Sequence, residues 1–101
     1  MSKMEKLLKI PYAVFNDWDL LQQFLDRRGN PMYEIVGDVN LFNRKDISDL
    51  GNLVRVDGFL DLYNTSVQSL GNLEYVSEEI WLSDDHQIPQ EELNKFNHTI
   101  W

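Results

Sequence analysis

Cysteine is absent from this chain of 101 residues, and basic residues are few. Without cysteine the protein can form no disulfide, bind no metal through thiolates and use no thiol nucleophile, which suits the reducing cytoplasm. Nine Lys and Arg residues against 17 Asp and Glu residues give a formal charge of −8 at pH 7. That balance disfavours direct binding of the protein to the phosphates of a nucleic acid.

Long apolar runs are missing too, because no stretch approaches the roughly 18 consecutive apolar residues of a membrane span. Residues 1–11 contain no long apolar stretch and no small-residue cleavage site, so we expect no export and place the protein in the cytoplasm. Three lysines in this segment are set against an overall charge of −8, so we expect no membrane binding either. A hydrophobic content of 43%, with 12% aromatic residues, is enough to build a packed core. These properties predict one single domain.

A unit of about 20 residues occurs three times along the chain. Residues 49–53 (DLGNL) return as residues 69–73 (SLGNL), and each copy is followed by a valine and then by a short alternating stretch. An earlier unit has no such pentapeptide but keeps the alternating stretch. The three alternating stretches are 38–41, 59–62 and 79–82. Matching features at one spacing indicate an internal repeat.

Each alternating stretch has one apolar face, which is the pattern of a half-buried β-strand. The residues expected to point inward are Val39, Leu41, Leu60, Leu62, Ile80 and Leu82. One unit cannot bury these side chains alone, so we expect successive units to stack and their strands to pair into a short parallel sheet. The Leu-Gly-Asn-Leu segment is expected to form the return arc, as a turn of helix with its leucines pointing inward.

The two ends of the chain differ from the repeats. A helix is predicted over 17–28, with Asp17 as its cap, apolar residues at helical spacing, and Gly29 just beyond its end. A short helix with Pro89 at its start is predicted within 89–96. The expected organisation is a helical N-terminal cap (1–34), three repeats (35–88) and a C-terminal cap (89–101).

The repeat resembles the leucine-rich repeat, whose pattern is L-x-x-L-x-L-x-x-N/C-x-L. The middle unit matches it best, with Leu60, Leu62, Thr65 at the Asn/Cys position and Val67 as the closing aliphatic residue. Charged residues take the Asn/Cys position in the other two units, so the asparagine ladder of the family is not expected. The resemblance implies an α/β fold, a small capped solenoid of short parallel strands. It also implies recognition of proteins through a sheet face and brings no catalytic residues.

The outward positions of the three expected strands hold the candidate binding residues. Large aromatic rings beside carboxylates are typical of protein interfaces, where rings anchor the partner and charges steer it. The candidates are Asp38, Asn40, Phe59, Asp61, Tyr63, Glu79 and Trp81, with Phe42 just beyond them. In the alternative interpretation, Phe59 and Trp81 pack beneath a terminal segment that folds across this face.

These observations favour a non-catalytic protein-binding module, a small acidic inhibitor or adaptor that occupies a basic surface of another protein. One alternative is a nucleic-acid mimic that blocks a DNA- or RNA-binding protein. Another is self-association through the strand edge at 79–82, which is open unless the C-terminal segment covers it. The chain contains no phosphate-binding loop, catalytic motif or metal-ligand spacing, and residues 84–86 (DDH) are interpreted as a polar turn. We therefore expect no cofactor and no metal.

Overall fold

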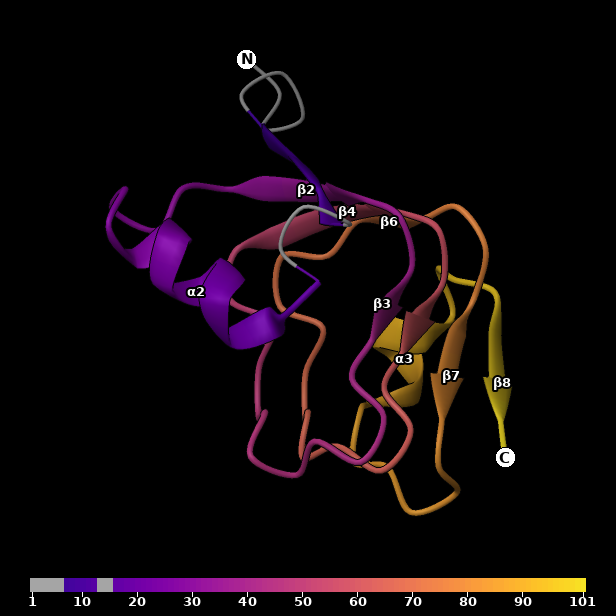
Figure 1. Ribbon diagram of the computed structural model, residues 1–101. Helices are drawn as coiled ribbons and strands as arrows, with labels where there is room; N and C mark the ends of the chain where they lie inside the picture. The colour runs from indigo at the N-terminus through magenta and orange to yellow at the C-terminus, as the bar shows by residue number, and fades with distance from the viewer. Residues whose placement is uncertain (1–6, 13–15) are drawn as a thin grey trace.

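Two parallel sheets enclose the core in the computed structural model, which describes residues 7–12 and 16–101 (Figure 1). Sheet A has the order β1-β2-β4-β6, with β1 (Leu8–Pro11), β2 (Tyr33–Val36), β4 (Leu53–Asp57) and β6 (Tyr75–Val76). Sheet B has the order β3-β5-β7-β8, with β3 (Val39–Asn40), β5 (Leu60–Asp61), β7 (Ile80–Leu82) and β8 (His98–Ile100). The helices within these described residues are α2 (Trp18–Asp26) and α3 (Gln90–Leu93). The fold is therefore of the mixed α/β class.

Each repeat supplies one strand to each sheet, and the chain crosses from sheet A to sheet B through a turn of two or three residues. Figure 1 shows sheet A across the top and sheet B down the right-hand side. Val39 lies opposite Leu60, and Leu60 lies opposite Ile80, in parallel register. The predicted parallel strands are thus confirmed as those of sheet B, and their inward aliphatic side chains are buried.

Sheet A is not predicted by the alternating pattern. The return arc was expected to contain a turn of helix, and this expectation is wrong. A tight turn, in which the Leu50 carbonyl accepts the Leu53 N–H at 3.4 Å, leads instead into β4. Leu53, Val54 and Val56 are all buried in β4, so the strand has no clean period-2 pattern. Without that signal the segment could be assigned to an arc but not to a strand.

The repeated pentapeptide is explained by the turn that it forms. The backbone at Gly51 is left-handed, with φ +62°, which glycine adopts without strain. Asp49 Oδ1 accepts the Gly51 N–H at 2.8 Å, and one unit later Ser69 Oγ makes the equivalent bond at 3.1 Å. Asn72 Nδ2 donates to Asn52 Oδ1 at 3.1 Å. Stacked turns are therefore linked through the asparagine of the pentapeptide, a position different from that of the leucine-rich repeat ladder.

Helix α2 confirms the predicted N-terminal helix, although residues 1–6 and 13–15 of the predicted cap lie outside the described residues. Asp17 Oδ1 accepts the N–H groups of Asp19 and Leu20 at 2.9 and 3.1 Å, which satisfies two donors that the helix itself leaves unpaired. The buried face of the helix consists of Trp18, Leu21 and Leu25. Neither helix in the described ranges combines the length and the apolar character needed to cross a bilayer.

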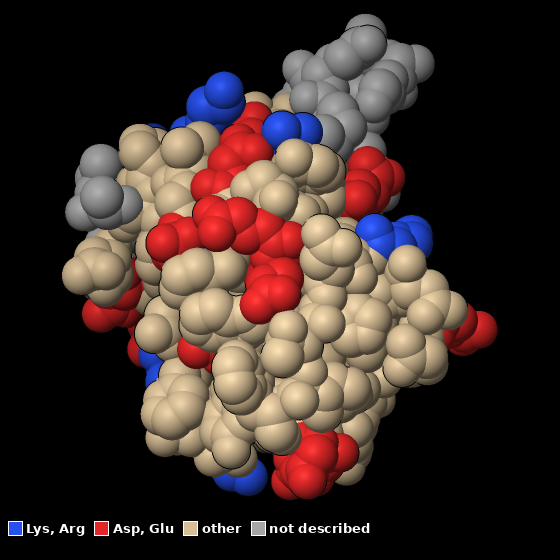
Figure 2. All heavy atoms as spheres, turned by 90° about the vertical axis from the view of Figure 1, so that its right-hand side faces the viewer, with Lys and Arg blue, Asp and Glu red and all other residues tan. Residues whose placement is uncertain are grey.

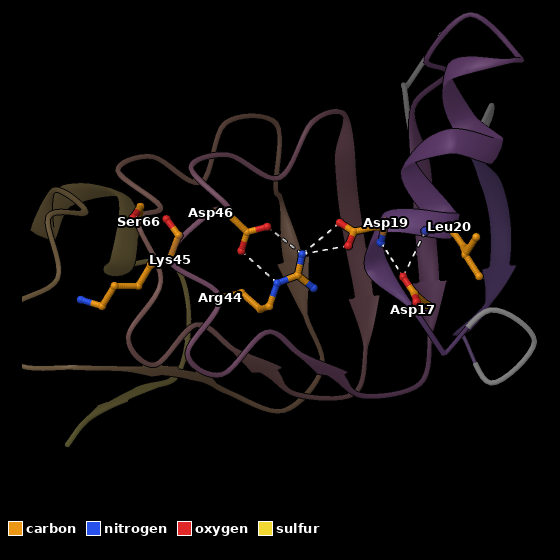
Figure 3. A network of polar contacts seen from close by, with 7 residues as sticks. All are labelled: Asp17, Asp19, Leu20, Arg44, Lys45, Asp46 and Ser66. Carbon is orange, nitrogen blue, oxygen red and sulfur yellow. Dashed lines mark hydrogen bonds and ion pairs between the residues drawn. The ribbon is translucent and has the colours of Figure 1, made fainter.

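Arg44 links helix α2 to the turn that follows β3 (Figure 3). Its Nη2 donates to Asp19 Oδ1 and to Asp46 Oδ2, each at 2.9 Å, and its Nε donates to Asp46 Oδ1 at 2.9 Å. The guanidinium lowers the pKa of the Asp46 carboxyl by hydrogen bonding to its charged form. Because these side chains are largely solvated, the network orients the start of the helix more than it stabilises the fold.

The C-terminal segment covers the edge of the last repeat. Helix α3 begins directly after Pro89 and is shorter than the predicted segment 89–96. Strand β8 then pairs with β7, placing Ile80 opposite His98. As a result β7 is an inner strand, and the outer position in sheet B belongs to β8.

Buried apolar side chains from both sheets and both helices form one continuous core. Tyr33 is the largest fully buried side chain, and its hydroxyl accepts from Gln22 Nε2 and donates to the Leu50 carbonyl, each at 3.1 Å. Burial raises the pKa of this hydroxyl. Among residues 7–12 and 16–101, every fully buried side-chain nitrogen or oxygen has a hydrogen-bond partner.

Candidate interaction face

The outward side chains of sheet B form three rows that run across its strands. The parallel register places Asn40, Asp61, Trp81 and Thr99 side by side in the middle row. The preceding row is Asp38, Phe59, Glu79 and Asn97, and the following row is Phe42, Tyr63, Ser83 and Trp101. We call these three rows the sheet B face. All seven predicted candidate residues lie in it.

Five aromatic rings on the sheet B face pack in two groups, one of three rings and one of two. The Phe59 and Trp81 rings stack with centroids 4.5 Å apart and planes 15° apart. Trp101 meets Trp81 edge-on, with centroids 6.4 Å apart. Phe42 and Tyr63 stack at 5.4 Å. Such contacts hold the rings in defined orientations, so a partner would meet a preformed surface.

The described terminal segments do not bury these rings. Strand β1 belongs to sheet A, and β8 extends sheet B at its edge without crossing its face. Phe59 and Trp81 are half-buried because they pack against each other and against their neighbours in the sheet. Trp101, which lies in the predicted C-terminal cap (89–101), is 64% exposed. It joins the face as a ring that the prediction missed.

Two of the predicted acidic residues position other groups on the face. Asp38 Oδ1 accepts the backbone N–H of Phe59 at 3.0 Å. Glu79 accepts the indole N–H of Trp81 through Oε1 and the Thr99 hydroxyl through Oε2, the latter at 3.1 Å. Glu79 therefore fixes the Trp81 ring and attaches β8, and Asp38 holds the backbone at Phe59, while both charges remain on the face.

Asp61 lies at the centre of the middle row and is only 6% exposed. Its Oδ1 accepts the backbone N–H of Tyr63 at 2.9 Å, and Asn40 makes the equivalent bond to Phe42 N–H at 3.0 Å in the neighbouring strand. Burial raises the pKa of the Asp61 carboxyl, and the bond from Tyr63 opposes this effect. The sequence placed Asp61 correctly on the outward side but did not predict its burial.

Charge on the sheet B face is of one sign. The segments that carry it, 37–43, 58–64, 78–83 and 97–101, contain four Asp or Glu residues and no Lys or Arg. Figure 2, which views the molecule from the side of β8, shows acidic side chains gathered in a band and basic side chains near the margins. Such a surface produces a negative potential that attracts cationic groups.

Two open hollows adjoin Trp81. One, of about 550 Å³, is lined by Phe59, Ser77, Glu78, Glu79, Trp81, Asn97 and His98. The other, of about 430 Å³, is lined by Phe42, Asp61, Tyr63, Trp81 and Trp101. The first is mainly polar and the second mainly aromatic, so the face offers two chemically different depressions that share the Trp81 side chain.

In the described part of the chain, no group of three or more His, Asp or Glu side chains is arranged so that it could hold a metal ion. Residues 84–86 form a turn in which His86 Nδ1 accepts the Ile88 N–H at 3.1 Å.

No protein-family model, curated protein or solved structure matches this chain. Functional inference therefore depends on the chemistry of the sheet B face.

Asp61→Asn is expected to raise the free energy of unfolding at neutral pH. The pKa of Asp61 is raised above its ordinary value of about 3.8, so the folded state penalises the charged carboxylate. This penalty is fully present above the folded-state pKa, decreases as the pH falls from the folded-state pKa to the unfolded-state pKa, and is absent below both. The amide can keep the bond to Tyr63 N–H, as Asn40 shows for Phe42.

Urea denaturation of both proteins at neutral pH and near pH 3 measures this effect. We expect the variant to be the more stable protein at neutral pH and the two to converge in acid. A stability difference that does not change with pH would show that the buried charge is not its cause.

Proposed function

We propose that this chain is a non-catalytic protein-binding module, an acidic inhibitor or adaptor whose sheet B face occupies a basic surface of a partner protein. The proposal is carried by one observation: five packed aromatic rings share a face with acidic groups and with no Lys or Arg. Aromatic residues dominate the binding energy of protein interfaces, and complementary charge accelerates association and selects the partner. A partner with Lys or Arg around an apolar centre would complement this face.

We also propose that the three repeats form a short solenoid of the leucine-rich-repeat type, capped by helix α2 and by the C-terminal segment, and that it acts in the cytoplasm. The parallel register, one unit apart, between equivalent residues of successive repeats supports this architecture. In stacked repeats each unit contacts its neighbours, and the strand face stays available for binding. The sheet B face would be that surface.

The internal contacts of the face also support recognition by a rigid surface. Glu79 fixes the indole of Trp81, and Asp38 fixes the backbone at Phe59. Side chains that are already ordered lose little conformational entropy when a partner binds, so more of the contact energy appears as affinity. This favours a specific protein partner over diffuse attraction of any polycation.

The double variant Phe59→Ala/Trp81→Ala is expected to bind the partner about 100-fold more weakly than the natural chain, because it removes the stacked centre of the face. The partner is isolated on immobilised wild-type chain, identified, purified and titrated by calorimetry. Circular dichroism and urea denaturation establish that the variant is folded.

Tyr75→Ala provides a matched control, since Tyr75 is an exposed ring on sheet A, with the Arg55 guanidinium 4.1 Å from its centroid. We expect this variant to keep its affinity for the partner. Unchanged binding by the folded double variant would refute the proposed face. Weakening that follows removal of acids outside sheet B more closely than removal of rings would favour a nucleic-acid mimic instead.

A further inference from the structure

The aromatic hollow of about 430 Å³ has the composition of a cation-binding site. Four rings, those of Phe42, Tyr63, Trp81 and Trp101, line it together with Asp61. The face of an aromatic ring attracts a positive charge, and Trp is the strongest of the three ring types in this respect. A carboxylate among such rings adds a full negative charge where water is partly excluded.

Asp61 has an oxygen available for such a cation. Its Oδ1 accepts the Tyr63 N–H, and Oδ2 has no hydrogen-bond partner among the described residues. Every fully buried side-chain oxygen in that part of the chain has a partner, so Oδ2 is in contact with the solvent space that Asp61 lines. The carboxylate is therefore nearly buried, accepts one hydrogen bond through Oδ1 and keeps Oδ2 accessible to solvent at a residue that lines the hollow.

No group of the protein itself neutralises this carboxylate. The side chains that line the hollow include no Lys or Arg, and Asp61 forms no ion pair among the described residues. Burying an unpaired charge is unfavourable, and proteins usually compensate it with a partner. The matching residue of the neighbouring strand, Asn40, makes the same backbone bond without a charge. The charge at Asp61 is thus not required by the backbone bond.

We propose that the hollow receives an arginine side chain of the partner protein, an inference that rests on the proposed function and specifies its central contact. A guanidinium is planar and can stack on an aromatic ring while its N–H groups point at Asp61 Oδ2. It is also less strongly hydrated than the ammonium of lysine, so it leaves water more readily. Arginine is one of the residues that most often dominate protein interfaces.

A peptide titration followed by NMR tests this contact without the partner. The probe is acetyl-Gly-Arg-Gly-amide, compared with peptides in which citrulline or lysine replaces arginine. Citrulline keeps the shape of the side chain and removes its charge. We expect the arginine peptide to shift the Tyr63 amide and the Trp81 and Trp101 indole signals, and to bind about tenfold more tightly than the citrulline peptide. The lysine peptide is expected to bind with an intermediate affinity.

Asp61→Asn is expected to reduce the affinity for the arginine peptide about tenfold. Asp84→Asn, which removes an exposed carboxylate outside the hollow, should leave the affinity unchanged and serves as the control. Equal binding of the arginine and citrulline peptides would overturn the proposal. So would equal binding by the Asp61→Asn variant, or the absence of any shift at about 10 mM arginine peptide.

The two proposals can fail separately. If Phe59→Ala/Trp81→Ala weakens the partner complex but the arginine peptide does not bind, the face remains an interface and the arginine contact is refuted. If the peptide binds but the double variant keeps its affinity for the partner, the proposed function is refuted and the hollow remains an arginine site. In the complex itself, Asp61→Asn should weaken binding about tenfold.

Discussion

Leu60→Ala is expected to lower the free energy of unfolding by about 3 kcal/mol. Leu60 is fully buried in β5, which has β3 on one side and β7 on the other. Removing its branched end leaves a cavity that the paired strands cannot close without breaking their register. Domains of this size have a total stability of roughly 5–15 kcal/mol, so one core leucine accounts for a large part of it.

Urea denaturation of the purified variant measures this loss. Leu20→Ala is the matched control, because Leu20 is a leucine of helix α2 that is 53% exposed. Its replacement should change the stability by no more than about 0.5 kcal/mol. Similar losses for the two variants would mean that the strands of sheet B do not enclose the core described here.

Gly58→Ala is expected to destabilise the fold by about 3 kcal/mol, through contact between successive repeats. Gly58 lies in the turn between β4 and β5. A Cβ atom there would lie 2.6 Å from the Gly37 carbonyl oxygen and 2.6 Å from Asp38 Oδ1. Neither atom can move freely, because Asp38 holds the Phe59 N–H and the Gly37 N–H is bonded to the Asp57 carbonyl at 3.0 Å.

Gly71→Ala is the control, because it measures the cost of a side chain at a left-handed backbone position where the added Cβ meets no close neighbour. Gly71 has φ +58°, but the nearest atom to its added Cβ would be 3.9 Å away. The control variant should therefore lose only about 1 kcal/mol. Urea denaturation of Gly58→Ala and Gly71→Ala measures the loss of stability in each variant. A loss at Gly58 no larger than that at Gly71 would contradict the close packing of the first two repeats.

The strands of sheet B and helix α2 could be predicted because their patterns are local. Val39 and Leu41, like Leu60 and Leu62, alternate with polar or aromatic residues, and the helix has both a capping residue and a single apolar face. Sheet A could not be predicted in the same way. Its strand β6 contains only two residues, and in β4 the consecutive residues Leu53 and Val54 are both buried. Neither strand leaves a periodic signal.

The candidate face was predicted in outline, because period-2 alternation determines which residues point outward. Its details depend on contacts between repeats. Trp101 was missed as a face residue since nothing local shows that β8 pairs with β7. Asp61 shares its hollow with Trp81 of β7 and with the rings of Phe42, Tyr63 and Trp101, which follow β3, β5 and β8, so its surroundings come from segments that no local pattern brings together. The bond from Glu79 to the Trp81 indole likewise requires the folded geometry.

Asp61 is expected to affect both the stability of the protein and its binding of a partner. Its buried charge opposes folding at neutral pH, as its raised pKa indicates, and the same charge supplies the proposed arginine contact. Residues retained for binding often reduce stability in this way. Asp61→Asn should therefore make the free protein more stable and its complex weaker, a combination that a purely structural role for Asp61 would not produce.

Hydroxyl-radical footprinting of the free chain and of its complex with the purified partner tests most directly whether the sheet B face is the binding surface. We expect Phe42, Trp81 and Trp101 to lose reactivity in the complex, whereas Tyr75 of sheet A keeps it. Protection of Tyr75, with the three sheet B rings equally reactive in both states, would show that the sheet B face is not the binding surface.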